Sequence, residues 1–198
     1  MTPYEQARQS IDAAHSADPK RTAAGQPAEL VYADRMEAWV GKLVPEPSRH
    51  LLLAARCQHL ERFLTPRATF PEGKVGYLQW RKSLYQKQAA RAHDLVIAAG
   101  LPETQADEIA RWVSKTDLKK DAGSQALEDA AVLVFLENEI GAFAAQHADY
   151  PREKFVDILR KTWRKLSAPA QNLACQLNLS PDIAALIREA ADAPPPKE

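Results

Sequence analysis

The stretch QALEDAAVLVFLE, residues 125–137, is the most apolar part of the chain and decides its fold class. Every position between Ala130 and Leu136 is apolar. A helix that is apolar on all sides must be buried. We therefore predict a buried core helix from about Gln125 to Gln146.

Helical signals dominate the rest of the sequence as well, and no stretch alternates polar and apolar residues with a period of two. Prolines and glycines mark the ends of the helical segments, and Thr2 with Glu5 forms a capping-box pattern that predicts the start of the first one. We expect further helices at about residues 3–14, 27–43, 48–64, 76–99, 103–115, 151–166 and 180–191, with a shorter one after Pro169. The prediction is an all-α fold with a single compact multi-helix domain over residues 1–192 and a disordered proline-rich tail at 193–198.

The charge balance and the cysteines limit the partners and the cellular compartment that the sequence suggests. Lysine and arginine number 26, as do aspartate and glutamate, so no overall field attracts nucleic acid or an anionic membrane. No apolar run approaches the roughly 20 residues that cross a bilayer, and the first residues lack the profile of a signal peptide. Cys57 and Cys175 form neither a metal-binding spacing nor a disulfide framework, as suits a reducing compartment. We expect a cytoplasmic protein with no membrane partner.

Two carboxylates, Glu128 and Asp129, directly precede the apolar run. A carboxylate that enters a buried helix must be solvated, paired or bound to a metal, because an unpaired buried charge is very costly. One interpretation is structural, since acids favour the positive N-terminal end of a helix and pair with nearby lysine or arginine. The other is functional, with the two acids facing a ligand.

His59 is the second candidate. It shares a predicted helical stripe with Leu52, Arg56 and Phe63, which places it half-buried beside the core. A histidine there is either a hydrogen-bonded structural residue or a base or ligand. A nearby carboxylate such as Asp129 would favour the second role, because a carboxylate fixes the tautomer and raises the basicity of the ring.

Basic residues with interleaved aromatics form the third candidate group, which either binds phosphate and stacks a base or forms solvated helix faces. The group consists of Trp80, Arg81, Lys82 and Tyr85, the loop lysines Lys115, Lys119 and Lys120, and the run from Lys161 to Lys165 around Trp163. The sequence has no glycine-rich phosphate loop, CxxC pair, HExxH or GxSxG motif. These absences argue against P-loop enzymes, zinc fingers, zincins and α/β-hydrolases.

Three segments resemble the metal-binding helices of the HD phosphohydrolases. LLLAARCQHLERF is similar to the HD helix, with Gln58-His59 at the His-Asp position. YADRMEAW is similar to the preceding helix, with Tyr32 where the first histidine stands, and LEDAAVLVFLE places Asp129 at the final aspartate. Two metal positions therefore depart from the pattern. The literal dipeptide His93-Asp94 fits less well, because it lies within a strongly charged helical segment.

The chain as a whole is similar to an uncharacterised bacterial and fungal family, domain of unknown function 4202. The segments that carry the resemblance are ELVYADRMEAW, LAARCQHLERF, GYLQWRK, LKKD, QALEDAAVLVFLE and DILRKTWRKLS, which span about Leu30 to Ser167. The resemblance identifies relatives and implies no particular reaction.

The leading hypothesis is an HD-like helical domain with a cleft that binds, or hydrolyses, a small phosphorylated metabolite, a nucleotide or another small anion. The catalytic candidates are His59, Glu128 and Asp129, with a divalent metal on His59 and Asp129. The expected substrate-binding residues are Arg35, Trp80, Arg81, Lys119, Gln125, Lys161 and Lys165. Two alternatives stay open: a non-catalytic regulatory or binding module with a degenerate metal site, and a helical protein associated with RNA.

Overall fold

The computed structural model describes residues 1–118 and 120–192 and confirms the all-α prediction. In these residues the only pairing of β type is an isolated bridge between Arg21 and Pro27. The predicted tail at 193–198 and Lys119 lie outside the described residues. The chain forms two compact units, Met1–Leu127 and Glu128–Glu198, which are described one at a time.

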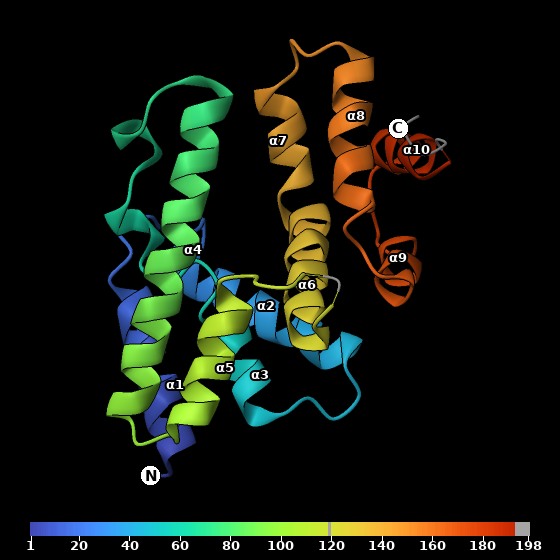
Figure 1. Ribbon diagram of the computed structural model, residues 1–198. Helices are drawn as coiled ribbons and strands as arrows, with labels where there is room; N and C mark the ends of the chain where they lie inside the picture. Colours follow the sequence, from blue (N-terminus) through green and yellow to red (C-terminus); the bar gives the residue numbers. More distant parts are fainter. Residues whose placement is uncertain (119, 193–198) are drawn as a thin grey trace. The chain divides into compact units, whose positions relative to one another are not determined.

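The first unit contains the helices predicted before residue 116 and the beginning of the predicted core helix, most of them close to their expected bounds (Figure 1). A capping box at Thr2 and Glu5 starts the first helix, as the sequence indicated. Its elements are α1 (Pro3–Ser16), α2 (Ala28–Leu43), α3 (Arg49–Arg56), two 3-10 turns (Arg62–Leu64 and Arg67–Thr69), α4 (Gly73–Ala98), α5 (Glu103–Val113) and the beginning of α6 (Ala122–Asn138).

Packing within the first unit is centred on apolar side chains from several helices. Ile11 of α1, Met36 of α2, Leu53 of α3 and Ile109 of α5 are fully buried. The long helix α4 lies against α5, and α3 packs against both α2 and α5. Helices α3 and α5 are amphipathic, and their apolar faces are buried in the core of this unit.

The apolar stretch at 125–137 forms α6, in which Leu127, Leu133 and Val134 are fully buried. The predicted single helix to Gln146 is interrupted at Glu139, whose φ of −121° and ψ of −23° are not helical. The chain then continues as α7 (Ile140–Gln146). The prediction of a buried helix is confirmed, and its C-terminal part is a separate helix.

The second unit continues through α8 (Arg152–Trp163), α9 (Ala168–Ala174) and α10 (Pro181–Ala191). Helices α8 and α10 pack together (Figure 1). Their apolar faces include Phe155 and Leu159 on α8 and Ile183 and Ile187 on α10, all buried. Both α8 and α10 therefore present one apolar face and one polar face.

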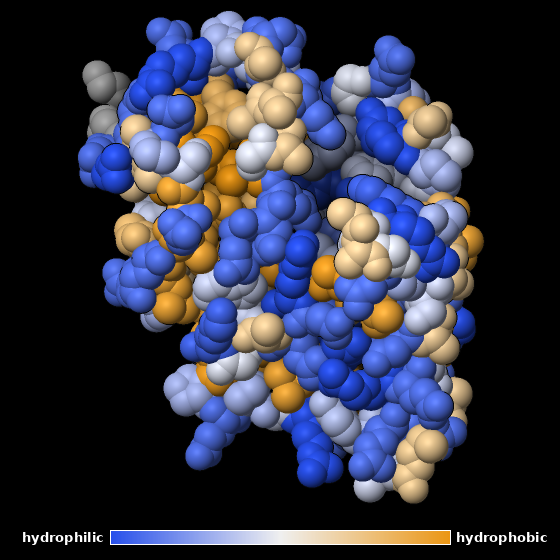
Figure 2. Space-filling model, turned by 180° about the vertical axis from the view of Figure 1, so that it is seen from behind, coloured by the Kyte–Doolittle hydropathy of each residue, from blue (hydrophilic) through white to orange (hydrophobic). Residues whose placement is uncertain are grey.

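The surface is mixed in character. In Figure 2 hydrophilic side chains cover much of the visible face, and apolar ones show between them in smaller patches. The large apolar side chains that are exposed include Leu64, Val75, Tyr77 and Leu78, around the beginning of α4. No helix in the described part of the chain combines the length and apolar character that crossing a bilayer requires.

Candidate functional site

His59 lies in a turn rather than on a helix, so the predicted helix 48–64 is wrong in its second half. Helix α3 ends at Arg56, and His59 and Glu61 both have a left-handed backbone, with φ of 62° and 51°. This region costs a non-glycine residue energy and is found mostly where surrounding structure holds it in place. The turn directs the His59 ring toward α2 instead of along a helical stripe.

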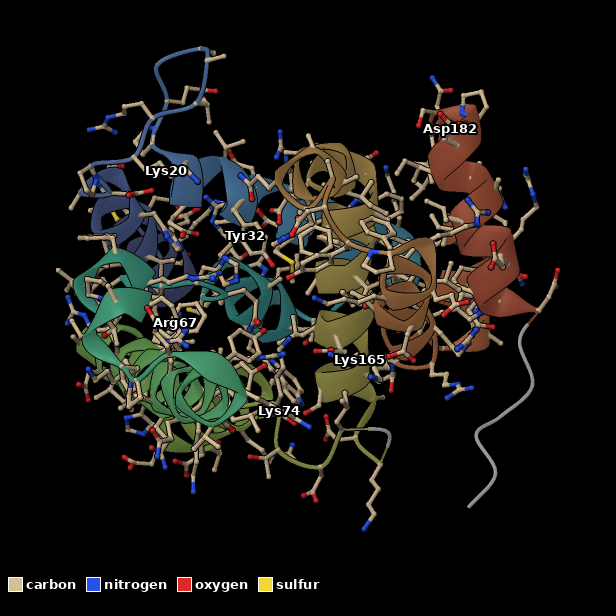
Figure 3. All side chains as sticks on the ribbon, turned by 90° about the horizontal axis from the view of Figure 1, so that it is seen from above. Lys20, Tyr32, Arg67, Lys74, Lys165 and Asp182 are labelled. Carbon is tan, nitrogen blue, oxygen red and sulfur yellow. The ribbon has the colours of Figure 1, made fainter. Side chains whose placement is uncertain are left out.

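The His59 ring is held by three neighbours, which we call with it the His59 cluster: Glu29, Tyr32, His59 and Arg62. Tyr32 of α2 (labelled in Figure 3) stacks on the imidazole, with ring centroids 4.0 Å apart and planes 10° from parallel. Nδ1 lies 3.2 Å from a Glu29 carboxylate oxygen, and Nη1 of Arg62 lies 2.8 Å from Nε2. All polar atoms of the ring therefore have partners.

These contacts favour one tautomer of His59. A guanidinium group only donates hydrogen bonds, and Nη1 of Arg62 lies 2.8 Å from Nε2 and 3.2 Å from Nδ1, so the nearer nitrogen, Nε2, is assigned as the acceptor. Nδ1 then carries the proton and donates it to Glu29. The ring is consequently neutral and fixed at both nitrogens.

The electrostatic surroundings keep His59 neutral. Burial is the largest influence and, with the positive charges of Arg62 and Lys115, lowers the pKa of His59 to about 4, while the hydrogen bond to Glu29 acts in the opposite direction. The His59 side chain is still 28 % exposed, so a ligand in solution can reach it.

A row of cations and aromatic rings continues from the His59 cluster along α4. The guanidinium of Arg62 lies 4.9 Å from the centre of the Trp80 ring, and Trp80 donates its Nε1 hydrogen to the Thr65 carbonyl at 2.9 Å. Arg81 donates to the hydroxyl of Tyr85. We call this the cation–aromatic row, and its members are Arg62, Tyr77, Trp80, Arg81, Tyr85 and Lys115.

Contacts between neighbouring members make the row continuous. The rings of Tyr77 and Trp80 lie 5.9 Å apart, and the guanidinium of Arg81 lies 5.8 Å from the Tyr77 ring. Nζ of Lys115 lies 5.7 Å from the Tyr85 ring. Within the described residues no carboxylate forms an ion pair with Arg62 or Arg81. The row therefore carries positive charge against aromatic faces, which is a setting for an anion.

The two predicted acids, Glu128 and Asp129, are both buried and contact Lys165 and Ser167 in the second unit. Lys165, labelled in Figure 3, places Nζ 3.0 Å from a Glu128 oxygen. Asp129 accepts the backbone N–H of Ser167 at 2.9 Å and its hydroxyl at 2.5 Å. Since Ser167 is the N-cap of α9, Asp129 supports the beginning of that helix.

The remaining predicted binding residues lie in several places. Arg35 is half-buried on α2 and Gln125 half-buried on α6. Lys161 is exposed on α8 and pairs with Asp157 at 2.5 Å. In the first unit the structure links His59 to Trp80 through Arg62, with Arg81 next along α4, and in the second it pairs Lys165 with Glu128 and Asp129 with Ser167. That His59 faces the two acids across a shared cleft stays a prediction.

Glu29 and Arg62 were not predicted to belong to the site. Arg62 follows His59 by three positions, and the left-handed turn between them lets its guanidinium fold back onto the ring. Glu29, in the first turn of α2, lies thirty positions before His59. The one sequence signal for Glu29 and Arg62 was that they lie in ELVYADRMEAW and LAARCQHLERF, two of the segments that carry the family resemblance.

A second charged network surrounds Arg56, which the sequence placed half-buried and the structure buries almost completely. Its guanidinium donates to Asp12 and Asp34 at 2.8 Å and to Glu37 at 2.7 Å, and Arg8 also binds Glu37. Burial alone would lower the pKa of Arg56, but the hydrogen bonds to three carboxylates raise it above its ordinary value. The network joins α1, α2 and α3 and is structural.

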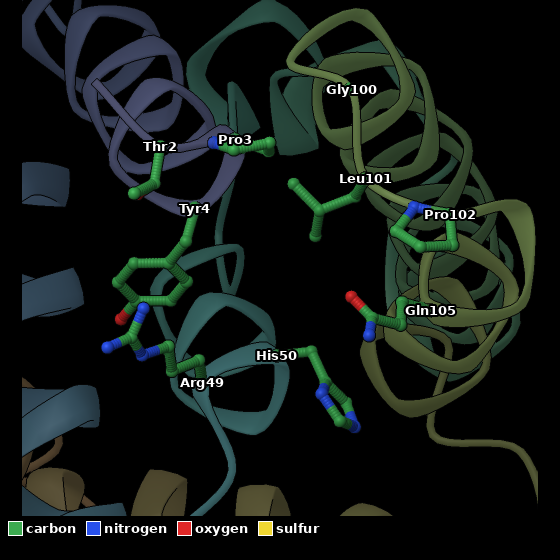
Figure 4. A pocket seen from close by; sticks show the side chains of 9 residues that line it. All are labelled: Thr2, Pro3, Tyr4, Arg49, His50, Gly100, Leu101, Pro102 and Gln105. Atoms are coloured by element: carbon green, nitrogen blue, oxygen red, sulfur yellow. The ribbon is translucent and has the colours of Figure 1, made fainter.

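A cavity of about 290 Å³ lies elsewhere in the first unit, as Figure 4 shows. Its two basic side chains already have partners: Arg49 lies over the Tyr4 ring at 5.5 Å, and His50 binds Glu108 at 2.8 Å. None of the predicted site residues line it. The lining residues are Thr2, Pro3, Tyr4, Arg49, His50, Gly100, Leu101, Pro102 and Gln105.

Comparison with known proteins gives one match. The sequence profile of the family described as "Domain of unknown function (DUF4202)" matches residues 5–187. No curated protein and no solved structure matches the chain. The profile covers the His59 cluster, the cation–aromatic row and both predicted acids.

Proposed function

The chain belongs to this family of unknown function, and we propose that it binds a small anionic ligand, a phosphorylated metabolite or a nucleotide, beside His59. The observation that carries the proposal is the charge of the cation–aromatic row. Arg62 and Lys115 contribute positive charge that acts on His59, and Arg81 adds a third cation farther along the row, beside Tyr77 and Tyr85, whereas Glu29 is the carboxylate that contacts the ring. An anion that reaches this place replaces water around the cations.

The chemistry of the donors favours phosphate. Arginine presents a planar fork of N–H groups that matches two oxygens of a phosphate or carboxylate, and such charge-assisted bonds are about twice as strong as neutral ones. Arg62 donates to His59, and within the described residues its guanidinium forms no ion pair with a carboxylate. The exposed ring of Tyr77, at 42 %, adds a surface on which a base can stack.

The arrangement around Nε2 favours binding over metal-dependent hydrolysis. A metal on His59 needs the lone pair that Arg62 now occupies, and it would meet the positive charges of Arg62 and Lys115. Two predictions from the sequence remain predictions. One is the metal site at His59 and Asp129, and the other is phosphoester hydrolysis by His59 with Glu128 and Asp129. Anion binding requires neither.

The proposal is tested by thermal shift and calorimetry on the full chain with inorganic phosphate, AMP and ATP. We expect a ligand-dependent rise in Tm, and we expect Arg62→Gln to weaken binding about tenfold, the loss of about 1.4 kcal/mol from one charge-assisted contact. Arg152→Gln is the matched control, since this exposed arginine pairs with Glu189 and belongs to neither cluster.

Two results would contradict the proposal. One is the absence of any Tm shift with all three ligands, and the other is a shift that Arg62→Gln leaves unchanged. Phosphate release measured in the same samples, with and without Mg²⁺, separates hydrolysis from binding. Turnover that His59→Asn abolishes would establish the catalytic alternative.

A further inference from the structure

A second group of side chains with ligand chemistry lies at the other end of α4, where the chain turns into α5. His93 is on α4, and Glu103 and Asp107 are on the first turns of α5. Nε2 of His93 lies 3.5 Å from an Asp107 oxygen and 3.9 Å from a Glu103 oxygen. One imidazole nitrogen therefore has carboxylate oxygens on two sides.

The fold produces this convergence. The connection between α4 and α5 is short, and Gly100, with a φ of 90°, reverses the chain within it. The two helices then pack side by side, which brings His93 opposite α5. Glu103 and Asp107 are four residues apart, so they lie on the same face of that helix.

From this geometry we propose that His93, Glu103 and Asp107 form a binding site for a divalent cation of the zinc class. Zinc takes imidazole nitrogen and carboxylate oxygen at about 2.0–2.2 Å, usually in a tetrahedron, so its ligand atoms lie about 3.3 Å apart. The pair from His93 to Asp107 already has this spacing, and Glu103 reaches it with a small change of a flexible, exposed side chain. Water fills the fourth position.

The local charge supports the site. In the described part of the chain no lysine or arginine forms an ion pair with Glu103 or Asp107, and both acids contact His93. Glu108, the next acid on α5, differs because it contacts His50 and Arg111. The acids around His93 therefore hold uncompensated negative charge beside a nitrogen donor, which a divalent cation neutralises.

Binding is measured by calorimetric titration of ZnCl₂ into the tag-free full chain. We expect one ion for each chain, and a zinc-dependent rise in Tm because the ion joins α4 to α5. His93→Ala and Asp107→Asn should each weaken binding at least about tenfold. All three positions are exposed or half-buried, so the metal-free Tm of each variant should equal that of the wild type.

Two control variants distinguish this site from other zinc ligands. Cys175 has an exposed thiol, and His147 is a half-buried histidine that packs against the rings of Phe143 and Tyr150. Cys175→Ser and His147→Ala should bind zinc as the wild type does. Three results would overturn the proposal. Zinc binding could survive in His93→Ala and Asp107→Asn, it could be lost in Cys175→Ser, or the wild type could fail to bind zinc at submillimolar concentration. Glu103→Gln provides an isosteric third test.

Discussion

At the scale of single residues, His59 makes stability depend on pH. Its folded pKa of about 4 lies below its ordinary value of 6.5, so the unfolded chain binds the proton first as the pH falls. Stability is therefore retained above pH 6.5 and lost as the pH falls between 6.5 and 4. Urea unfolding at pH 7.5 and pH 5 should differ by about 2 kcal/mol from this residue.

His59→Asn is the variant that isolates this contribution. Asparagine tolerates a left-handed backbone better than most residues and does not titrate in this range. The pH dependence should therefore shrink in the variant. His15, also buried with a lowered pKa, contributes in the same direction and leaves a remainder. An equally steep loss of stability in His59→Asn would contradict the assignment.

The two cysteines should differ in reactivity. Burial raises the pKa of Cys57 to about 12, whereas Cys175 is exposed. Because the thiolate is the reactive form, iodoacetamide at pH 8 should label one thiol in the native chain and two after denaturation. Mass spectrometry of Cys175→Ser should then find no label in the native state. Native labelling of Cys57 would show that the interior beneath α3 opens readily.

At the scale of elements, two glycines inside helices should respond in opposite ways to alanine. A Cβ at Gly123 of α6 would lie 2.3 Å from the Trp112 ring, but a Cβ at Gly41 of α2 meets nothing within 4 Å. We expect Gly123→Ala to cost about 1–3 kcal/mol of unfolding free energy through overpacking. Gly41→Ala should add about 0.5 kcal/mol through helix propensity. Chemical denaturation of both variants checks the pair.

Most of the helices could be predicted from the sequence, and one could be predicted only in part. Capping residues, prolines and apolar stripes predicted nearly every helix, because those signals act locally. The helix at 48–64 failed after Arg56, since no local residue type announces a left-handed backbone at His59 and Glu61. That turn is held by tertiary contacts with Tyr32 and Glu29, which a one-dimensional pattern does not contain.

The candidate site was predicted in part for the same reason. Trp80 and Arg81 stand out in sequence as an aromatic next to a cation, and the structure places them in the cation–aromatic row. Arg62 and Glu29 have no such signature, because their roles arise only from the turn at His59. Asp129 was predicted as an acid that enters a buried helix, and the structure shows it bound to Ser167, the N-cap of α9.

At the scale of the whole molecule, charge distinguishes small anions from RNA. The formal net charge is zero, so the chain as a whole has little electrostatic attraction for a polyanion. We expect any RNA shift seen at low salt to vanish by about 150 mM salt, with phosphate or AMP binding retained. A gel-shift series in salt measures this. RNA binding that persists at that salt concentration would favour the RNA-associated alternative.

The Arg56 network should restrict which substitutions are found among homologous sequences. Arg56 is the fully buried member of this network, and breaking a buried ion pair costs about 3–5 kcal/mol, a large part of the stability of a typical domain. Single replacements of Arg56, Asp12 or Glu37 should therefore be rare among relatives. Positions 8, 12, 34, 37 and 56 should instead be inherited together or exchanged together for an apolar set, and this covariation should be visible when homologous sequences are aligned.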